Sequence, residues 1–281
     1  MGKKKSSAGG ITLPQERISD IAAMAERGSS AALGGVPETD DTLDALFEGR
    51  LKFYQSRSGY RVSLDAVLLA HFVKITAGDK IVDLGAGNGA IALMLAHFYP
   101  MTRLTALEIQ PRMLARARRN AILNGLEMRI TTLKGDVRAL ETLAEPENYD
   151  VAVCNPPYRS PLSGRVSPNA EKRIARHEFE GALKHFLQAG RHFLAPKGRM
   201  ALVYPAFRCV DLLVSMRAAG FEPKRLRMVH SISGSEGSLV LVEGVKGGKS
   251  EIVVEPPLIV YDAASQYSAE VAAMLAGEAA P

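Results

Sequence analysis

The sequence has little cysteine and no long apolar run. Its two cysteines, Cys154 and Cys209, lie far apart and lack the spacing of metal ligands. This scarcity indicates a reducing compartment and argues against a disulfide framework or a zinc site. The lysines at positions 3–5 are followed by Ser, Ala and Gly, which excludes a secretory signal, and no apolar run is long enough to cross a bilayer. We therefore expect a soluble, cytoplasmic protein that holds no metal.

The charge balance is mildly basic. Over 281 residues, a net charge of +5 and a pI near 9.2 favour a polyanionic partner without proving one, because many enzymes of neutral ligands are mildly basic. Hydrophobic residues make up 47% of the chain, which is enough for a sizeable core in one large domain or two small ones.

The composition changes near residue 40. Residues 1–40 are rich in Gly, Ser, Ala and scattered charges, which predicts a poorly ordered tail with one helical piece around residues 18–27. The lysines at positions 3–5 could contact nucleic acid or simply face solvent, and we favour the second interpretation. From Thr42 the pattern is dense and has no internal repeat. We expect one domain over residues 41–265 and a C-terminal tail over residues 266–281.

Short β-branched and apolar runs alternate with longer helical patterns in this domain. The expected strands are 80–84, 103–108, 129–135, 149–154, 199–204, 224–230 and 238–245, and the expected helices are 90–98, 111–124, 181–193 and 207–219. The alternation predicts βαβ units and a doubly wound, mostly parallel seven-stranded α/β sheet. The last two strands lack a long helix between them, so one strand should enter antiparallel. Ligands of such folds bind outside the carboxyl ends of the strands.

The first expected strand runs into a glycine-rich loop, residues 83–89 (DLGAGNG), and a helix follows at once. Glycines let the backbone turn sharply and let a ligand approach without a Cβ in the way. The loop also satisfies a looser dinucleotide pattern, with Glu108 near the distance of a ribose-binding acid, so a nicotinamide-dependent dehydrogenase is one interpretation. Asp83 and Asp136 argue against it, because carboxylates at this edge would repel a pyrophosphate and suit an amine-bearing ligand.

These residues resemble the three cofactor-binding motifs of class I methyltransferases, which use S-adenosylmethionine (SAM) on a Rossmann-like fold. The resemblance implies that Gly85 and Gly87 lie against the methionine part of SAM. It implies that Glu108 holds the ribose hydroxyls and that Asp136 binds the adenine amine, although a helix N-cap explains Asp136 equally well. The further cofactor contacts expected from the resemblance are Asp83, Ala86, Asn88, Ile109, Val137 and Asn155.

The fourth expected strand ends in Asn155-Pro156-Pro157-Tyr158. Asn and Pro are turn residues, but two prolines also fix φ over consecutive residues and give a rigid backbone above the loop. The Asn155 side-chain oxygen and the Pro156 carbonyl could accept both N–H hydrogens of an exocyclic amine, which aims the nitrogen lone pair at a methyl donor. Tyr158 could stack on a base taken out of its own stack. The motif resembles that of amino-methyltransferases, which act on adenine or cytosine amines or on glutamine amides.

The segment 60–70 narrows the resemblance. It is similar to the segment that closes over the methionine end of SAM in bacterial tRNA (adenine-N6)-methyltransferases acting on position 37 of valine tRNA. Arg176-His177-Glu178 is also similar to that family, and the resemblance covers residues 43–261. It implies a tRNA substrate and adds Asp65 to the cofactor contacts, although Asp65 could equally be an ordinary acid at a helix start.

A basic segment follows the Asn155 motif. It contains a single acid, and we predict that it is a loop whose cations hold the phosphates that flank a flipped nucleotide: Arg159, Arg165, Lys172, Arg173 and Arg176. The alternative is a solvated flexible loop.

Other functions stay open at this point. One is modification of a glutamine amide in translation release factors, although that family carries an ordered helical domain before the core. Amino-methylation of rRNA or DNA is another. A non-catalytic RNA-binding module on a decayed fold is a third, but decay should have removed the glycines, acids or motif, and all are present. The dehydrogenase lacks support because no separate catalytic domain is evident. We therefore predict a SAM-dependent methyltransferase acting on the N6 amine of adenine in tRNA.

Overall fold

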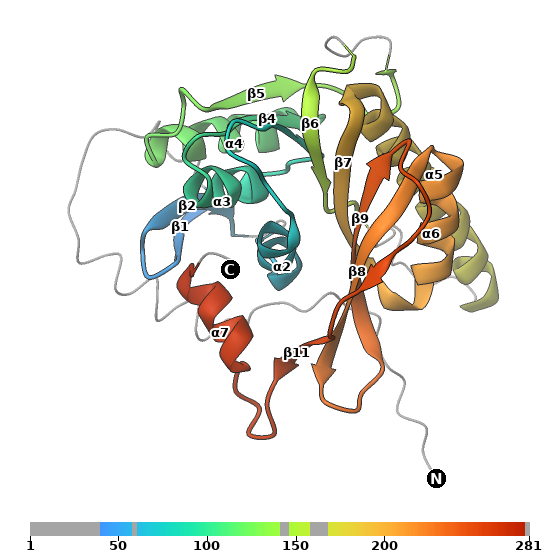
Figure 1. Cartoon of the computed structure of the whole chain (residues 1–281). Coiled ribbons are helices and arrows are strands. Elements are labelled where there is room, and N and C mark those ends of the chain that lie inside the picture. The colour runs from blue at the N-terminus through green and yellow to red at the C-terminus, as the bar shows by residue number, and fades with distance from the viewer. Residues whose placement is uncertain (1–39, 58–60, 141–145, 158–167, 279–281) are drawn as a thin grey trace.

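The computed structural model describes residues 40–57, 61–140, 146–157 and 168–278, without the side chains of residues 168–180. A central sheet carries helices on both of its faces (Figure 1). Residues 1–39 of the predicted N-terminal tail, including its helical piece, lie outside the described residues. Among the helices of the described ranges, none has the length and apolar character needed to span a membrane.

The central sheet has the strand order β5-β4-β3-β6-β7-β9-β8-β10, and β11 also pairs with β8. Its strands are β3 (Lys80–Leu84), β4 (Arg103–Glu108), β5 (Ile130–Lys134), β6 (Tyr149–Cys154), β7 (Leu194–Pro205), β8 (Phe221–Ile232), β9 (Gly237–Lys246), β10 (Val253–Val254) and β11 (Leu258–Tyr261). The strand β9 runs antiparallel to its neighbours β7 and β8, and the other pairings in this sheet are parallel. This confirms the predicted doubly wound sheet with one antiparallel strand. The seven predicted strands are present, and β10 and β11 extend the edge at β8.

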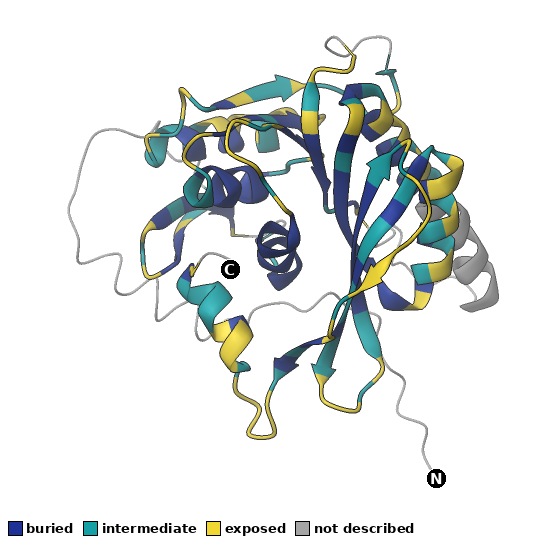
Figure 2. Cartoon of the chain, in the orientation of Figure 1, coloured by how far each residue is buried: buried dark blue, intermediate teal, exposed yellow. Residues whose placement is uncertain are grey.

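Helices cover the two faces in separate groups. On one face lie α2 (Leu64–Phe72), α3 (Ala90–Phe98) and α4 (Pro111–Leu123), and on the other lie α5 (Pro168–Phe193), the 3-10 turn η2 (Ala206–Arg208) and α6 (Cys209–Ala218). All nine residues of α2 are buried (Figure 2). Apart from Asp65 and His71 they are apolar, because the sheet, α3 and the C-terminal helix α7 (Ala269–Ala276) enclose this helix.

A two-stranded hairpin of β1 (Asp41–Leu46) and β2 (Leu51–Ser56) packs against α3 and α4. The sequence pattern does not predict these strands. Their connecting turn places Phe47 and Glu48 at φ 56°, where side chains are uncommon, and it lacks the Asn-Gly or Asp-Gly signal of a two-residue hairpin.

The helix α7 lies in the segment that the sequence set apart as a C-terminal tail. The Ser268 hydroxyl caps it by accepting from the amide of Val271, whose side chain is fully buried. At its other end, Gly277 takes the left-handed conformation of a helix C-cap, and His71 of α2 contacts the Met274 carbonyl oxygen at 3.0 Å. The packed chain therefore continues beyond residue 265.

One predicted helix is too short. The sequence predicts a helix from residue 181 and a loop before it, whereas α5 starts at Pro168. Proline suits a helix start because its missing N–H has no partner there in any case. Lys172, Arg173 and Arg176 therefore lie on the backbone of a helix, and their assignment to a loop is wrong.

Candidate active site

Four neighbouring parallel strands, in the order β5, β4, β3 and β6, have their carboxyl ends along the same edge of the sheet. The parallel registers of β3 and β6 end together, so Gly85 and Asn155 leave the sheet side by side. On the other side of β3, the strand β4 ends at Glu108, and Asp136 follows β5 by two residues. The fold therefore gathers the predicted cofactor motifs and the start of the Asn155 motif at one edge.

The glycine loop has a backbone that other residues adopt only with strain. Gly85, Gly87 and Gly89 have φ values of 71°, 57° and 83°. The amide of Gly85 donates to the carbonyl oxygen of Leu107 at 2.9 Å, and the amide of Gly87 donates to a carboxylate oxygen of Glu108 at 2.8 Å. A Cβ built at Gly87 would meet no atom within 4 Å. The loop is thus fixed to β4 and leaves open space beside its central glycine.

Asp83 carries a buried carboxylate beneath this loop. The residue is 1% exposed, and neither carboxylate oxygen has a partner at hydrogen-bond geometry within the described residues. Burial raises the pKa of Asp83 to about 7; the nearby amide of Ala92 in α3 opposes this shift, and the charge of Glu108 adds to it. Because a buried carboxylate is costly unless a cation or close donors compensate for its charge, this position fits a ligand that brings a cationic amine.

Glu108 holds the glycine loop and the end of β4 together. It is 4% exposed, and its two carboxylate oxygens accept from the amides of Gly87 and Gln110, each at 2.8 Å. Each oxygen keeps a further lone pair, so the carboxylate could still accept from a ribose diol. Glu108 therefore fits the cofactor role expected for it and also stabilises the loop.

Asp136 lies in a more exposed part of the site, and its carboxylate already pairs with a residue of the protein. Its carboxylate forms an ion pair with the Arg138 guanidinium at 2.6 Å and accepts from the Arg138 amide at 2.9 Å, and the Arg138 hydrogen bond holds the pKa of Asp136 below its ordinary value. Ile109 is 43% exposed after β4, and Val137 is half-buried. The two apolar side chains could pack against the faces of an adenine ring, and the nearby carboxylate could accept a hydrogen bond from its amine.

The Asn155 motif begins directly after β6. Asn155 is half-buried, Pro156 is buried and Pro157 is exposed, and Tyr158 lies outside the described residues. Asn155 is therefore accessible at the edge where the glycine loop ends, and the adjoining proline ring anchors the turn in the protein. Its catalytic role and that of Tyr158 stay predictions.

The hairpin holds the segment that leads into α2. The Gln55 side-chain oxygen accepts from the amide of Val62 at 2.5 Å, and Asp44 pairs with Arg61 at 2.8 Å. Asp65 follows in the first turn of α2 and is buried. This position is consistent with an acid that interacts favourably with the positive end of the helix dipole. The hairpin thus positions the start of α2, where the predicted cofactor contact Asp65 lies.

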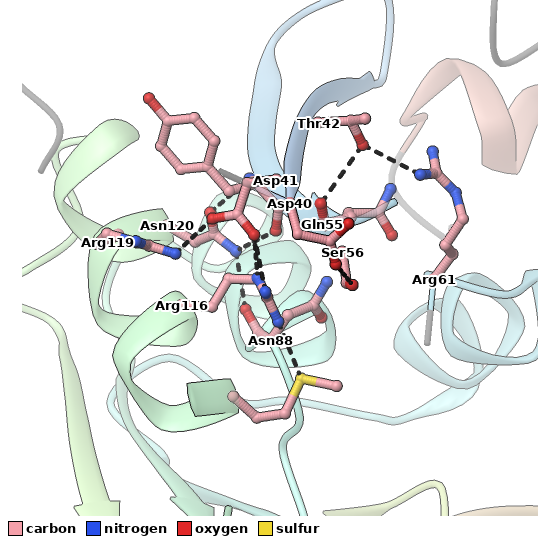
Figure 3. A network of polar contacts seen from close by, with 12 residues as sticks. Asp40, Asp41, Thr42, Gln55, Ser56, Arg61, Asn88, Arg116, Arg119 and Asn120 are labelled. Carbon is pink, nitrogen blue, oxygen red and sulfur yellow. Dashed lines mark hydrogen bonds and ion pairs between the residues drawn. The ribbon is translucent and has the colours of Figure 1, made fainter. Parts of the chain in front are cut away.

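The same hairpin is anchored to α4 by a buried ion-pair triad. The carboxylate of Asp41, fully buried, binds Arg116 at 2.7 Å and also Arg119, and their side chains are 4% and 14% exposed (Figure 3). These contacts join residues about 75 positions apart in the sequence. Sequence reasoning missed this brace, because no local pattern reports a pairing of that separation.

The predicted phosphate-binding residues divide into two groups. Arg159 and Arg165 lie outside the described residues. Lys172, Arg173 and Arg176 lie on α5, although the structure describes only their backbone. Their contact with nucleic acid stays a prediction.

The sequence matches a known family and named relatives. The family model for the methyltransferase small domain matches residues 63–215. A Porphyromonas gingivalis protein named tRNA1(Val) (adenine(37)-N6)-methyltransferase is 32% identical over 225 residues, which cover 77% of this chain and 87% of that protein. A protein of the same name from Aliivibrio fischeri is 33% identical over 185 residues, covering 66% of this chain and 77% of that protein.

The fold also has a solved counterpart. A structure described as a predicted O-methyltransferase from Agrobacterium tumefaciens superposes with a TM-score of 0.65 at 23% identity, covering 77% of this chain and 98% of that one. This likeness concerns the fold alone. From the family model and the curated relatives together, the chain belongs to the methyltransferase small domain family, in the group that contains the proteins named tRNA1(Val) (adenine(37)-N6)-methyltransferase.

Proposed function

We propose that this protein transfers the methyl group of SAM to the N6 amine of adenine 37 in the anticodon loop of valine tRNA. The observation that carries the proposal is the likeness to named relatives over more than three quarters of the chain, with identity at or above 30%. The arrangement of the sheet edge supports it, because the glycine loop and Asn155 emerge side by side.

The cofactor would extend along the strand ends in a fixed direction. We assign its methionine amine to Asp83, its ribose to Glu108 and its adenine to Asp136 with Ile109 and Val137. The unpartnered carboxylate of Asp83 supports this assignment, since a cationic amine would compensate for its burial. SAM supplies an electrophilic methyl group on a sulfonium, so the protein needs no strong base.

The substrate amine is the part that the protein must position. The nitrogen lone pair of an adenine amine is delocalised into the ring, and the Asn155 side-chain oxygen and the Pro156 carbonyl would accept its two hydrogens. Such acceptors favour a tetrahedral nitrogen and direct its lone pair toward the methyl donor. The half-buried setting of Asn155 supports this role, because water then competes less for its oxygen.

The tRNA would present an unpaired base to this edge. Proteins read RNA sequence mainly where bases can be splayed out, as in an anticodon loop. Tyr158 would stack on the extruded adenine, and the basic residues between Arg159 and Arg176 would bind the flanking phosphates. The net charge of +5 supports a polyanionic partner.

A methylation assay with parallel acceptors tests the proposal. Labelled SAM is offered with valine tRNA, the same transcript with adenine 37 replaced by guanine, a DNA of equal length and a translation release factor. We expect N6-methyladenosine, identified by nucleoside digestion and mass spectrometry, from the unaltered tRNA alone. The Asn155→Ala variant serves as the inactive control for contaminating methyltransferases. Label in the release factor only, or equally in the guanine transcript, would refute the assignment.

A further inference from the structure

Asn120 of α4 and Asn124, the C-cap of that helix, bind the outer edge of β2. The Asn120 side chain accepts from the Tyr54 amide at 2.6 Å and donates to the Tyr54 carbonyl at 3.1 Å. One helical turn later, the Asn124 side chain accepts from the Lys52 amide at 2.9 Å and donates to the Lys52 carbonyl at 2.5 Å. Residues four apart share a helix face, so the two amides replace a neighbouring strand along this edge.

The two asparagines differ in the third bond that each one makes. The Asn124 amide also donates to the Asn120 carbonyl within its own helix, at 2.7 Å. The Asn120 amide instead crosses to the glycine loop and donates to the carbonyl oxygen of Asn88 at 2.9 Å (Figure 3). Asn120 is fully buried and Asn88 is 2% exposed, so water cannot easily replace this donor.

The Asn88 carbonyl belongs to the peptide that joins the glycine loop to the N-cap of α3. Asn88 precedes the helical ladder of α3, whose N-cap is Gly89 at φ 83°. The Gly89 amide closes a turn to the Ala86 carbonyl at 2.9 Å, and the Gly89 carbonyl accepts from Leu93. Since Gly89 has no Cβ, the peptide between Asn88 and Gly89 can rotate with little steric cost. Such a rotation would break the turn and move the amides that face the cofactor.

We propose that Asn120 is a positioning residue that fixes the peptide between Asn88 and Gly89 and thereby keeps the glycine loop in its SAM-binding form. The proposal rests on the function proposed above and adds a residue in α4 to its cofactor site. Without the Asn120 amide, the Asn88 carbonyl would be buried without a donor, which favours a rotated peptide. The loop would then exchange between forms, and SAM would bind only the population that keeps the original one.

The experiment compares Asn120→Ala with Asn124→Ala by calorimetry with SAM and with S-adenosylhomocysteine. Each substitution removes one acceptor and two donor bonds, and both loosen the hairpin, but only Asn120→Ala frees the glycine loop. We expect SAM affinity to fall about tenfold or more in Asn120→Ala and by less than about twofold in Asn124→Ala. In turnover assays, Asn120→Ala should raise the KM for SAM, with the KM for tRNA and the kcat at saturating SAM near wild type. Amide exchange of residues 87–89 should be faster in this variant alone.

The possible outcomes separate the two proposals. Wild-type protein that binds no SAM would refute the proposed function and, with it, this inference. Wild-type binding with equal SAM affinity in the two variants would overturn only the role of Asn120. Asn120→Ser repeats the measurement with a smaller loss of packing and a hydroxyl too short to reach Asn88 from the same Cβ, and it should weaken SAM binding like Asn120→Ala. If neither Asn120 variant folds, Asn120 is structural and the proposal is wrong.

Discussion

Burial raises the pKa of the Asp83 carboxyl to about 7, and the charge of nearby Glu108 adds to this shift. Both acids stand at the ends of adjacent strands, yet Glu108 receives two amide donors and Asp83 receives none at hydrogen-bond geometry. The Asp83 carboxyl is therefore partly protonated at neutral pH. The proposed contact of Asp83 with the methionine amine would therefore make SAM binding depend on pH.

We predict that SAM affinity falls in acid because a neutral Asp83 cannot pair with the methionine amine. With a pKa of about 7, the dissociation constant should rise by about tenfold between pH 8 and pH 6. Calorimetry in buffers of different ionisation enthalpy should detect proton release on binding below pH 7. In Asp83→Asn, SAM should bind weakly at every pH, and a wild-type affinity that stays constant over this range would contradict the assignment.

The buried carboxylate of Asp83 should also destabilise the ligand-free protein at neutral pH. Its carboxyl titrates near 3.8 when unfolded and near 7 when folded. Between these values the folded state binds more protons, so this group lowers the free energy of unfolding as pH rises. Urea unfolding of Asp83→Asn should therefore show higher stability than wild type at pH 8 and equal stability below pH 4.

Asn155→Ala tests the amine site. We expect turnover to fall by about a hundredfold or more, because a group that orients the reacting nitrogen acts mainly in the transition state. SAM affinity, measured by calorimetry on the same preparation, should change little. Full activity of the variant would mean that another group holds the amine.

Tyr158 is expected to act through its ring. Tyr158→Ala should raise the KM for tRNA, since stacking on a base contributes about 1–3 kcal/mol, whereas Tyr158→Phe should stay close to wild type. Filter binding with tRNA measures the difference directly. Equal weakening in both variants would transfer the role from the ring to the hydroxyl.

The buried ion pairs of Asp41 should contribute much more to the free energy of unfolding than a surface ion pair does. Asp41→Ala leaves the buried Arg116 and Arg119 without their shared carboxylate, which should cost about 3–5 kcal/mol. Arg217→Ala removes an exposed pair with Glu222 and should cost less than about 1 kcal/mol. Urea unfolding of the two variants gives both values, and a similar loss in each would contradict the anchoring role.

The core of the fold could be predicted from local signals in the sequence. The starts of β3, α3, β4, α4 and β6 fall at the predicted residues, because each of these elements is bounded by glycines, prolines or a charged residue. The acids predicted to bind the cofactor were chosen on the same kind of signal, since Asp83 and Glu108 lie in the last two residues of their strands and Asp136 follows β5 by two residues. Local composition determines where a buried parallel strand ends, and strand ends carry the site.

The parts that were missed depend on contacts between distant residues. Tyr54 and Asn120 lie 66 positions apart, and neither carries a local mark of its partner. A buried asparagine inside a helix rich in alanine and arginine was the one available signal, because polar groups at buried positions need partners. The start of α5 was missed because a stretch of cations was interpreted as a loop, although charge does not prevent helix formation.

The hairpin contacts α7, so this part of the fold can be completed only after α7 has been synthesised. Arg50 donates to the Ala276 carbonyl, and Gly277 packs against the ring of Phe47, where a Cβ would approach to 2.6 Å. The hairpin is synthesised early, but these partners follow more than 200 residues later, and at about 5–20 residues per second the delay on the ribosome is on the order of 10–45 s. Through that interval the Phe47 ring, 1% exposed in the finished fold, lacks its cover from α7. A ribosome that stops near residue 265 would release a chain with this apolar surface open, ready for a chaperone or a protease.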